Sequence, residues 1–173
     1  SKILYHWRAI EGSTAQCASQ KTYTSEAGLK ALIDIIPYLN ESWFVGHGKL
    51  DNTFHISRPI EDLPKISIII PTKDQSVLLK TCIDSVISKT IYENYEIVIV
   101  DNDSMEAKTN IYFSEIEQYK NVRILKYPKP FNYSAINNYA VSQCVDSDYV
   151  LLLNNDIEVI NKGWLTEMLS IAQ

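Results

Sequence analysis

The stretch that decides the fold is Tyr149-Val-Leu-Leu-Leu-Asn-Asn-Asp156, an aromatic and apolar run that passes directly into three polar residues. Periodicity alone does not distinguish so short a run from part of a buried helix, but the polar residues on both sides favour a strand. An unbroken apolar strand is typical of a parallel sheet in which both strand faces are buried. Such sheets bind ligands just beyond the carboxyl ends of their strands. We therefore expect Asn154, Asn155 and Asp156 to lie at a binding edge.

Asp156 is the candidate metal ligand at that edge. Its carboxylate suits Mg2+ or Mn2+, hard cations that prefer oxygen ligands and share them with the phosphates of a substrate. The alternative is that Asn154-Asn-Asp156 only caps the turn after the strand, which is a common role for Asn and Asp. The stretch by itself is compatible with both interpretations.

Composition restricts the class of protein. The chain has 173 residues, of which 46% are hydrophobic and 21% charged, as in a soluble globular domain with a proper core. A net charge of −5 and the lack of a Lys/Arg cluster argue against a nucleic-acid partner. The sequence shows neither a transmembrane segment nor a signal-peptide pattern, so we expect a cytoplasmic protein, at the inner face of the membrane in a full-length form.

Strand and helix patterns alternate from Lys65 onward. This order is typical of an α/β fold with a Rossmann-like, doubly wound, mostly parallel sheet and helices on both faces. Right-handed crossovers then place all strand ends on one edge. The expected strands are 66–70 (stopped by Pro71), 96–100, 122–126 and a central strand from Tyr149, and the expected helices are 76–89, 106–118, 133–144 and one from 163 or 164.

The first part of the chain has less regular patterns. A strand is expected at 2–8 and a helix at 25–36, ended by Pro37. Residues 40–64 are rich in Gly and Pro and predict a connector with one short strand near Phe54. We therefore divide the chain into an extension, 1–62, and a domain, 63–173.

Polar residues follow every expected strand of that domain. One such residue is usually an ordinary turn residue, but four strand ends that converge on acid and amide groups predict a site. No Gly-rich dinucleotide or P-loop motif is present. We therefore expect phosphate to be bound through a metal, and the carboxylate after the second strand to reach a ribose or a base. The residues concerned are Thr72, Lys73 and Asp74, then Asp101, Asn102 and Asp103, then Asn132, and finally Asn154 and Asp156.

Three motifs in this order resemble the nucleotide-sugar half of family 2 glycosyltransferases. They are Pro64-Lys-Ile-Ser-Ile-Ile-Ile-Pro-Thr72, Tyr95-Glu-Ile-Val-Ile-Val-Asp-Asn-Asp-Ser104 and Leu151-Leu-Leu-Asn-Asn-Asp156. The resemblance covers about 63–173. It implies the GT-A fold, a nucleoside-diphosphate sugar as donor, a carbohydrate acceptor, and Mn2+ or Mg2+ as cofactor.

The resemblance also implies roles for individual residues. Thr72 and Asp101 would contact the nucleoside, and Asn138 would match an Asn near the start of the preceding helix. Two departures matter. Asn154 replaces the first Asp of the family's DxD motif, and Asn102-Asp103 replaces the usual second Asp-Gly of the family's nucleoside motif, which leaves the role of Asp103 open. The expected substrate-binding residues are Pro71, Thr72, Asp101, Asp103, Asn132, Asn138 and Asn154, with Asp156 as metal ligand.

Both ends of the chain suggest a fragment of a longer, tandem transferase. Leu4-Tyr-His-Trp-Arg8 with Gly12-Ser-Thr14 resembles the segment that closes many such catalytic domains, which favours the tail of a preceding domain over the alternative of a peripheral strand of this domain. An inverting transferase needs a general base, which in this family lies well beyond the DxD motif. The chain ends 17 residues after Asp156. We therefore expect a fragment that recognises the donor but lacks the catalytic base and the acceptor site.

The leading functional hypothesis is therefore the donor domain of an inverting glycosyltransferase for surface polysaccharide. A nucleotidyltransferase would share the sheet and the metal carboxylate, but it normally has a Gly-rich basic loop where this chain has Pro71-Thr-Lys-Asp74. A non-catalytic nucleotide-binding or assembly module is the third possibility, because Asn154 lacks the charge of an Asp.

Overall fold

The computed structural model describes residues 2, 5, 23–39 and 42–173. The chain forms two compact units, one of 60–169 and one of 1–59 with 170–173. The expected strand at 2–8 and the motif Gly12-Ser-Thr14 lie outside the described residues, except for residues 2 and 5. The division of the chain at 62/63 stays a prediction.

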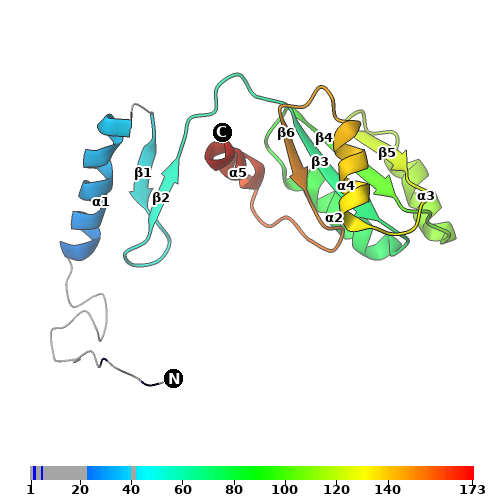
Figure 1. The fold of residues 1–173 in the computed structure, drawn as a ribbon, viewed down its shortest axis with the longest axis horizontal. Helices are drawn as coiled ribbons and strands as arrows, with labels where there is room; N and C mark the ends of the chain where they lie inside the picture. The colour runs from blue at the N-terminus through cyan, green and yellow to red at the C-terminus, as the bar shows by residue number, and fades with distance from the viewer. Residues whose placement is uncertain (1, 3–4, 6–22, 40–41) are drawn as a thin grey trace. The chain divides into compact units, whose positions relative to one another are not determined.

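The larger unit contains a four-stranded parallel sheet with the strand order β5-β4-β3-β6. Strands and helices alternate along the chain, so the doubly wound α/β fold is confirmed (Figure 1). In chain order the elements are β3 (Ile66–Thr72), α2 (Ser76–Lys89), β4 (Tyr95–Asp101), α3 (Ala107–Ile116), β5 (Val122–Lys126), α4 (Tyr133–Ser142), β6 (Tyr149–Leu152) and α5 (Trp164–Ala172).

Helices cover both faces of this sheet because the central strands are apolar on both sides. Ile68 and Ile70 of β3 belong to one core cluster, together with residues of α2, α3 and α5. Ile69, between them in the sequence, faces the opposite cluster, which is closed by Ile136 and Ala140 of α4. All three isoleucines are fully buried, and each stabilises the fold by about 1.5–3 kcal/mol.

The expected central strand is instead an edge strand. Among the described residues β6 pairs only with β3, and its residues alternate between partly buried and exposed. Val150 and Leu152 are 44% and 45% exposed. The prediction of burial on both faces was wrong, because β3 and β4 occupy the middle of the sheet and α4 packs against them.

Strand β3 also differs from expectation because it continues through Pro71. Ile69 accepts a hydrogen bond from the backbone of Leu153, and the pairing with β6 ends there. The backbone groups of alternate residues in a strand point towards the same neighbouring strand. The backbone nitrogen of Pro71 therefore faces the β6 edge, as the carbonyl of Ile69 does. No ladder bond is needed from Pro71 on that side, so its missing N–H costs nothing.

The smaller unit contains a helix and a hairpin. Helix α1 (Tyr23–Ile35) continues into the short 3-10 helix η2 (Ile36–Leu39), and the antiparallel strands β1 (Phe44–His47) and β2 (Phe54–Ser57) follow. The connector was expected to hold one strand, so β1 was missed. Its four residues include Gly46 and are too few to show an alternating pattern.

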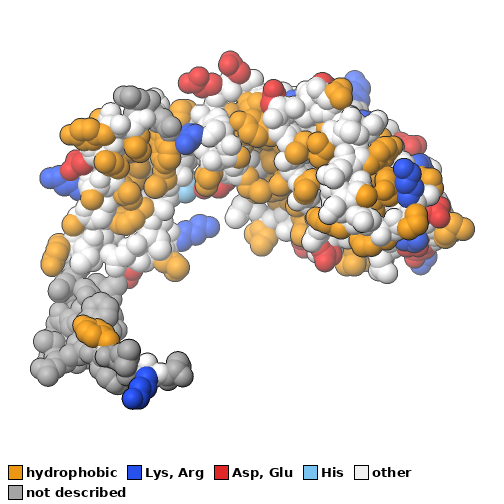
Figure 2. Space-filling view, in the orientation of Figure 1, with side chains coloured by type: hydrophobic (Ala, Val, Ile, Leu, Met, Phe, Trp, Pro, Cys, Tyr) orange, Lys and Arg blue, Asp and Glu red, His pale blue; other side chains and the backbone are white. Residues whose placement is uncertain are grey.

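The surface and the helix lengths bear on possible partners. On the face in view, Lys and Arg side chains of the described residues are scattered rather than gathered into one patch (Figure 2). No helix in the described part of the chain is both long enough and apolar enough to cross a bilayer.

Candidate functional site

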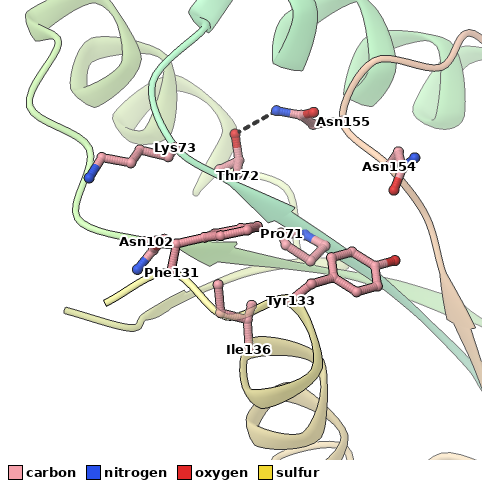
Figure 3. Close-up of a pocket in the computed structure, with 9 residues that line it drawn as sticks. All are labelled: Pro71, Thr72, Lys73, Asn102, Phe131, Tyr133, Ile136, Asn154 and Asn155. Carbon is pink, nitrogen blue, oxygen red and sulfur yellow. Dashed lines mark hydrogen bonds between the residues drawn. The ribbon is translucent and has the colours of Figure 1, made fainter. Parts of the chain in front are cut away.

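A pocket of about 210 Å3 lies beyond the carboxyl ends of β3, β4 and β6. Its side chains come from these strand ends, from the loop before α4 and from α4 itself (Figure 3). Lys73 is the only charged side chain among them. The lining residues are Pro71, Thr72, Lys73, Asn102, Phe131, Tyr133, Ile136, Asn154 and Asn155.

Three of the expected site residues line this pocket, namely Pro71, Thr72 and Asn154. Lys73, Asn102 and Asn155 were expected at this edge but were not in the set of substrate-binding residues. Phe131, Tyr133 and Ile136 were not expected at the site at all. The remaining expected residues, which are not among the lining residues, are Asp101, Asp103, Asn132, Asn138 and Asp156.

Thr72 connects the first strand end to the loop after β6. The amide Nδ2 of Asn155 donates a hydrogen bond to Oγ1 of Thr72 at 3.0 Å (Figure 3). Below the loop, the thiol of Cys82 on α2 donates to the carbonyl oxygen of Asn154 at 3.6 Å. Burial raises the pKa of Cys82 to about 11, so the thiol keeps its proton at neutral pH and remains a donor.

Asp101 closes β4 and is 1% exposed. Its Oδ2 receives an ion-paired hydrogen bond from Nζ of Lys126 at 2.7 Å, and its Oδ1 accepts from the backbone N–H of Ser104 at 3.0 Å. Each carboxylate oxygen therefore already has a partner within the domain. The neighbouring Asp103 is exposed and has a left-handed backbone, with φ 62°.

Asn102 is the residue after β4 that reaches the pocket. It is 2% exposed, and its Nδ2 donates to the carbonyl oxygens of Tyr127 at 2.9 Å and Lys129 at 2.7 Å. These bonds tie the end of β4 to the loop that carries Phe131. Asn102 is the second residue of the polar stretch Asp101-Asn-Asp-Ser104. Its hydrogen-bond partners, however, are distant in the chain.

The loops after β3 and β4 are braced against each other. Oδ1 of Asp74 accepts from the backbone N–H groups of Met105 and Glu106, at 2.8 and 2.7 Å. In return, the backbone N–H of Asp74 donates to Oγ of Ser104 at 2.7 Å. Asp74 and Gln75 both have left-handed φ values, 54° and 58°, which Asp tolerates better than most residues.

The two asparagines near α4 have different positions. Asn132 caps the helix, since its side chain accepts from the backbone N–H of Ala135 at 2.9 Å. Asn138 is exposed. The buried asparagine of this helix is Asn137, at 4% exposure, whose Nδ2 donates to the carbonyl of Tyr133.

Asp156 follows the pocket residues Asn154 and Asn155 and is exposed. Among the described residues, no group of three His, Cys, Asp or Glu side chains is placed to hold a metal ion. A single accessible carboxylate still fits Mg2+ or Mn2+, because such ions keep several waters and take further oxygens from substrate phosphates. The donor set therefore fits a metal that binds together with a phosphorylated ligand.

A parallel sheet with a crevice at the carboxyl ends of its strands defines a Rossmann-like domain, and the glycosyltransferases of the GT-A type that this chain resembles share this arrangement. The solved structure of the mannosyltransferase PcManGT from Pyrobaculum calidifontis, in complex with GDP-Man and Mn2+, has this fold. It superposes with a TM-score of 0.57 at 16% identity, over 90% of this chain and 43% of that one.

Residues 67–173 match the model of Glycosyl transferase family 2, and the chain belongs to this family. It is 41% identical over 175 residues to the uncharacterized protein y4gI of Sinorhizobium fredii (strain NBRC 101917 / NGR234), covering 100% of this chain and 19% of that protein. It is 36% identical over 172 residues to the O-antigen biosynthesis protein RfbC of Myxococcus xanthus, covering 98% and 13%. The chain thus spans less than a fifth of the length of either relative.

Proposed function

We propose that the pocket binds a nucleoside-diphosphate sugar and that the protein transfers the sugar to a carbohydrate acceptor in the synthesis of a surface polysaccharide. The observation that carries the proposal is the convergence of three strand ends on one pocket at the carboxyl edge of the sheet. Membership of the transferase family and the similarity to an O-antigen biosynthesis protein support it.

The lining residues divide the pocket into an apolar part and a polar part. Phe131 and Pro71 offer apolar surface for a base, and stacking on an aromatic ring stabilises a bound base. Within the described part of the chain, Lys73 is exposed and forms no ion pair, so its ammonium group is free to approach a phosphate. These features suit a nucleotide whose base lies against the ring and whose phosphates lie towards Lys73.

Asp156 would hold the divalent metal together with the phosphates of the donor. A bound metal neutralises the charge that develops on the departing diphosphate. The neighbouring amide of Asn154 can orient the ligand by hydrogen bonding but adds no charge. For this reason we propose that metal and nucleotide bind cooperatively, each weakly without the other.

The base that deprotonates the acceptor would come from outside this pocket, because none of the lining residues is a carboxylate or a histidine. An inverting transfer needs such a group within hydrogen-bond reach of the acceptor hydroxyl. The second candidate function is nucleotide binding without catalysis, which the amide of Asn154 at the DxD position favours.

Calorimetric titration of uridine and guanosine diphosphates, with and without millimolar Mn2+, tests the donor site. We expect Mn2+ to strengthen binding by about 1–3 kcal/mol, or roughly 5- to 150-fold. Asp156→Asn should abolish this coupling and leave metal-free binding nearly unchanged. Glu117→Gln is the control, since Glu117 is an exposed acid at the end of α3 that does not line the pocket. Equal affinities with and without Mn2+ would overturn the metal assignment, and a lack of any nucleotide binding would overturn the function.

A further inference from the structure

A second cavity, of about 230 Å3, lies in the smaller unit, where the open end of the β1–β2 hairpin meets the last residues of α5. We call it the hairpin cavity. All of its lining residues belong to the smaller unit, and none of them lines the pocket at the carboxyl edge of the sheet. Pockets for drug-sized ligands have about 300–1,000 Å3, so this cavity suits a ligand of one ring. The lining residues are Trp43, Ile56, Ser57, Arg58, Ser170 and Ile171.

The aromatic wall of the hairpin cavity is the indole of Trp43. The hairpin register pairs Phe44 with Ser57, so Trp43 and Arg58 lie opposite each other just beyond the last pair. The guanidinium carbon of Arg58 is 4.6 Å from the centroid of the Trp43 ring, which is within the range of a cation–π attraction. Trp43 is only partly buried, so some of its ring stays accessible to a ligand.

The charge of Arg58 is already used within the unit. Its Nη1 donates to the carbonyl oxygen of Gln173, and Nε2 of Gln173 donates to the carbonyl oxygen of Pro59 at 2.7 Å. Arg58 is also the one charged residue of the lining. Because its guanidinium already stacks and donates within the unit, the lining suits a neutral ligand better than a phosphate or a carboxylate.

A neutral sugar ring matches the remaining surfaces of the hairpin cavity. One face of a pyranose carries C–H groups, which pack on aromatic or aliphatic side chains such as Trp43, Ile56 and Ile171. Hydroxyl groups surround the ring, and the hydroxyl of Ser57 can both donate to them and accept from them. We propose that the hairpin cavity binds one neutral sugar residue of the carbohydrate acceptor. This inference rests on the proposed function, which supplies the acceptor.

The two cavities then have separate tasks. The pocket at the sheet edge binds the donor nucleotide, and the hairpin cavity holds the acceptor chain at a sugar that takes no part in the reaction. None of the residues that line the hairpin cavity is a carboxylate or a histidine, so it offers binding without a group for proton transfer.

Binding of simple glycosides to the purified chain tests this inference. Saturation-transfer NMR with the methyl glycosides of glucose, galactose, mannose and rhamnose, each at millimolar concentration, should show contact with at least one of them. N-acetylleucinamide is the comparison probe, which represents an apolar side chain of a protein partner. A signal from none of the glycosides, or a stronger one from N-acetylleucinamide, would overturn the inference. The calorimetric titration of nucleotides reports on the proposed function independently, so the two can fail separately.

Two substitutions assign glycoside binding to the hairpin cavity. Trp43→Ala removes the aromatic wall and should weaken binding about tenfold, whereas Trp43→Phe should retain most of it. Ile171 is 66% exposed, so Ile171→Trp fills the cavity without disturbing a core and should weaken binding as strongly. Ile111→Trp is the matched control, since Ile111 is a 60% exposed isoleucine on α3 that lines neither cavity.

Uridine diphosphate affinity should stay the same in all four variants, because none of the substituted residues lines the donor pocket. Glycoside binding that persists unchanged in both Trp43→Ala and Ile171→Trp would place the sugar elsewhere and overturn the proposal. Because Ile171→Trp changes an exposed side chain, it decides the matter even if Trp43→Ala does not fold.

Discussion

Both carboxylate oxygens of Asp101 have hydrogen-bond partners within the domain, so we expect the residue to contribute to stability. Replacing it by alanine removes the acceptor for the Ser104 N–H and the partner of Lys126. We expect Asp101→Ala to lower the free energy of unfolding by about 1–3 kcal/mol, the usual cost of leaving a buried donor unpaired. Urea denaturation measures this change.

The exposed neighbour Asp103 provides the control for that measurement. Asp103→Asn keeps a residue that tolerates a left-handed backbone, so its effect should stay within about 0.5 kcal/mol. The sequence also predicts that Asp101 contacts the nucleoside, in which case nucleotide affinity falls in the alanine variant. Unchanged stability together with lost affinity would show that the internal bonds contribute little and that Asp101 acts on the ligand.

Residues beyond the strand ends differed in how well the sequence predicted them. Pro71, Thr72 and Asn154 were predicted to lie at the binding edge because each belongs to or follows a strand, and they line the pocket. Asn102 was expected at the same edge but was not in the set of substrate-binding residues. The position of its side chain depends on carbonyl groups 25 and 27 residues further along the chain, which no local pattern places.

At the scale of elements, the start of α3 depends on Glu106. Its Oε2 accepts from Oγ1 of Thr109 at 2.8 Å and from the backbone N–H of Ser76 at 3.2 Å, and the bond from Thr109 is the main cause of a lowered pKa of the carboxyl group. Because the pKa of Glu106 is lowered in the folded state, its ionised carboxylate stabilises the fold at pH values above the ordinary Glu pKa. This stabilisation is lost as the pH falls through the lowered value.

Unfolding measured from neutral pH to below about pH 4 should show this loss. In Glu106→Gln the oxygen that accepts the two bonds remains but no longer titrates, so the fall in stability with acid should be smaller than in the unmutated protein. Glu117→Gln, at an exposed site at the end of α3, is the control and should leave the pH profile unchanged. Identical profiles for all three proteins would contradict the assigned role of Glu106.

Helices and strands were predicted well wherever the spacing of apolar residues in the sequence matched the burial of the element in the fold. Helix α2 has the predicted bounds, Ser76–Lys89, because its apolar residues recur at helical spacing and a sheet covers that side. The wrong prediction concerned β6, whose apolar run looks fully buried although the strand lies at an edge. Neighbour order in a sheet is a property of the whole chain, so an apolar run of this length cannot reveal it.

For the whole molecule, the pocket predicts binding without turnover. Since the described lining offers no acid or base for an acceptor hydroxyl, we expect the purified chain to hydrolyse a nucleotide sugar slowly at most. Product analysis with a carbohydrate acceptor should show no acceptor-dependent transfer near the usual enzyme rate of about 1 per second or more. Transfer at such a rate would contradict the proposal that the base comes from elsewhere.

The open edge of the sheet has a consequence for handling the protein. In the described part of the chain β6 presents unpaired backbone groups together with the exposed side chains of Val150 and Leu152. Such an edge is a template for strand addition by another chain. We expect the isolated chain to self-associate and finally to precipitate as its concentration rises, which light scattering detects. Val150→Lys, a charge on the exposed side of that edge, should raise its solubility while leaving nucleotide affinity unchanged.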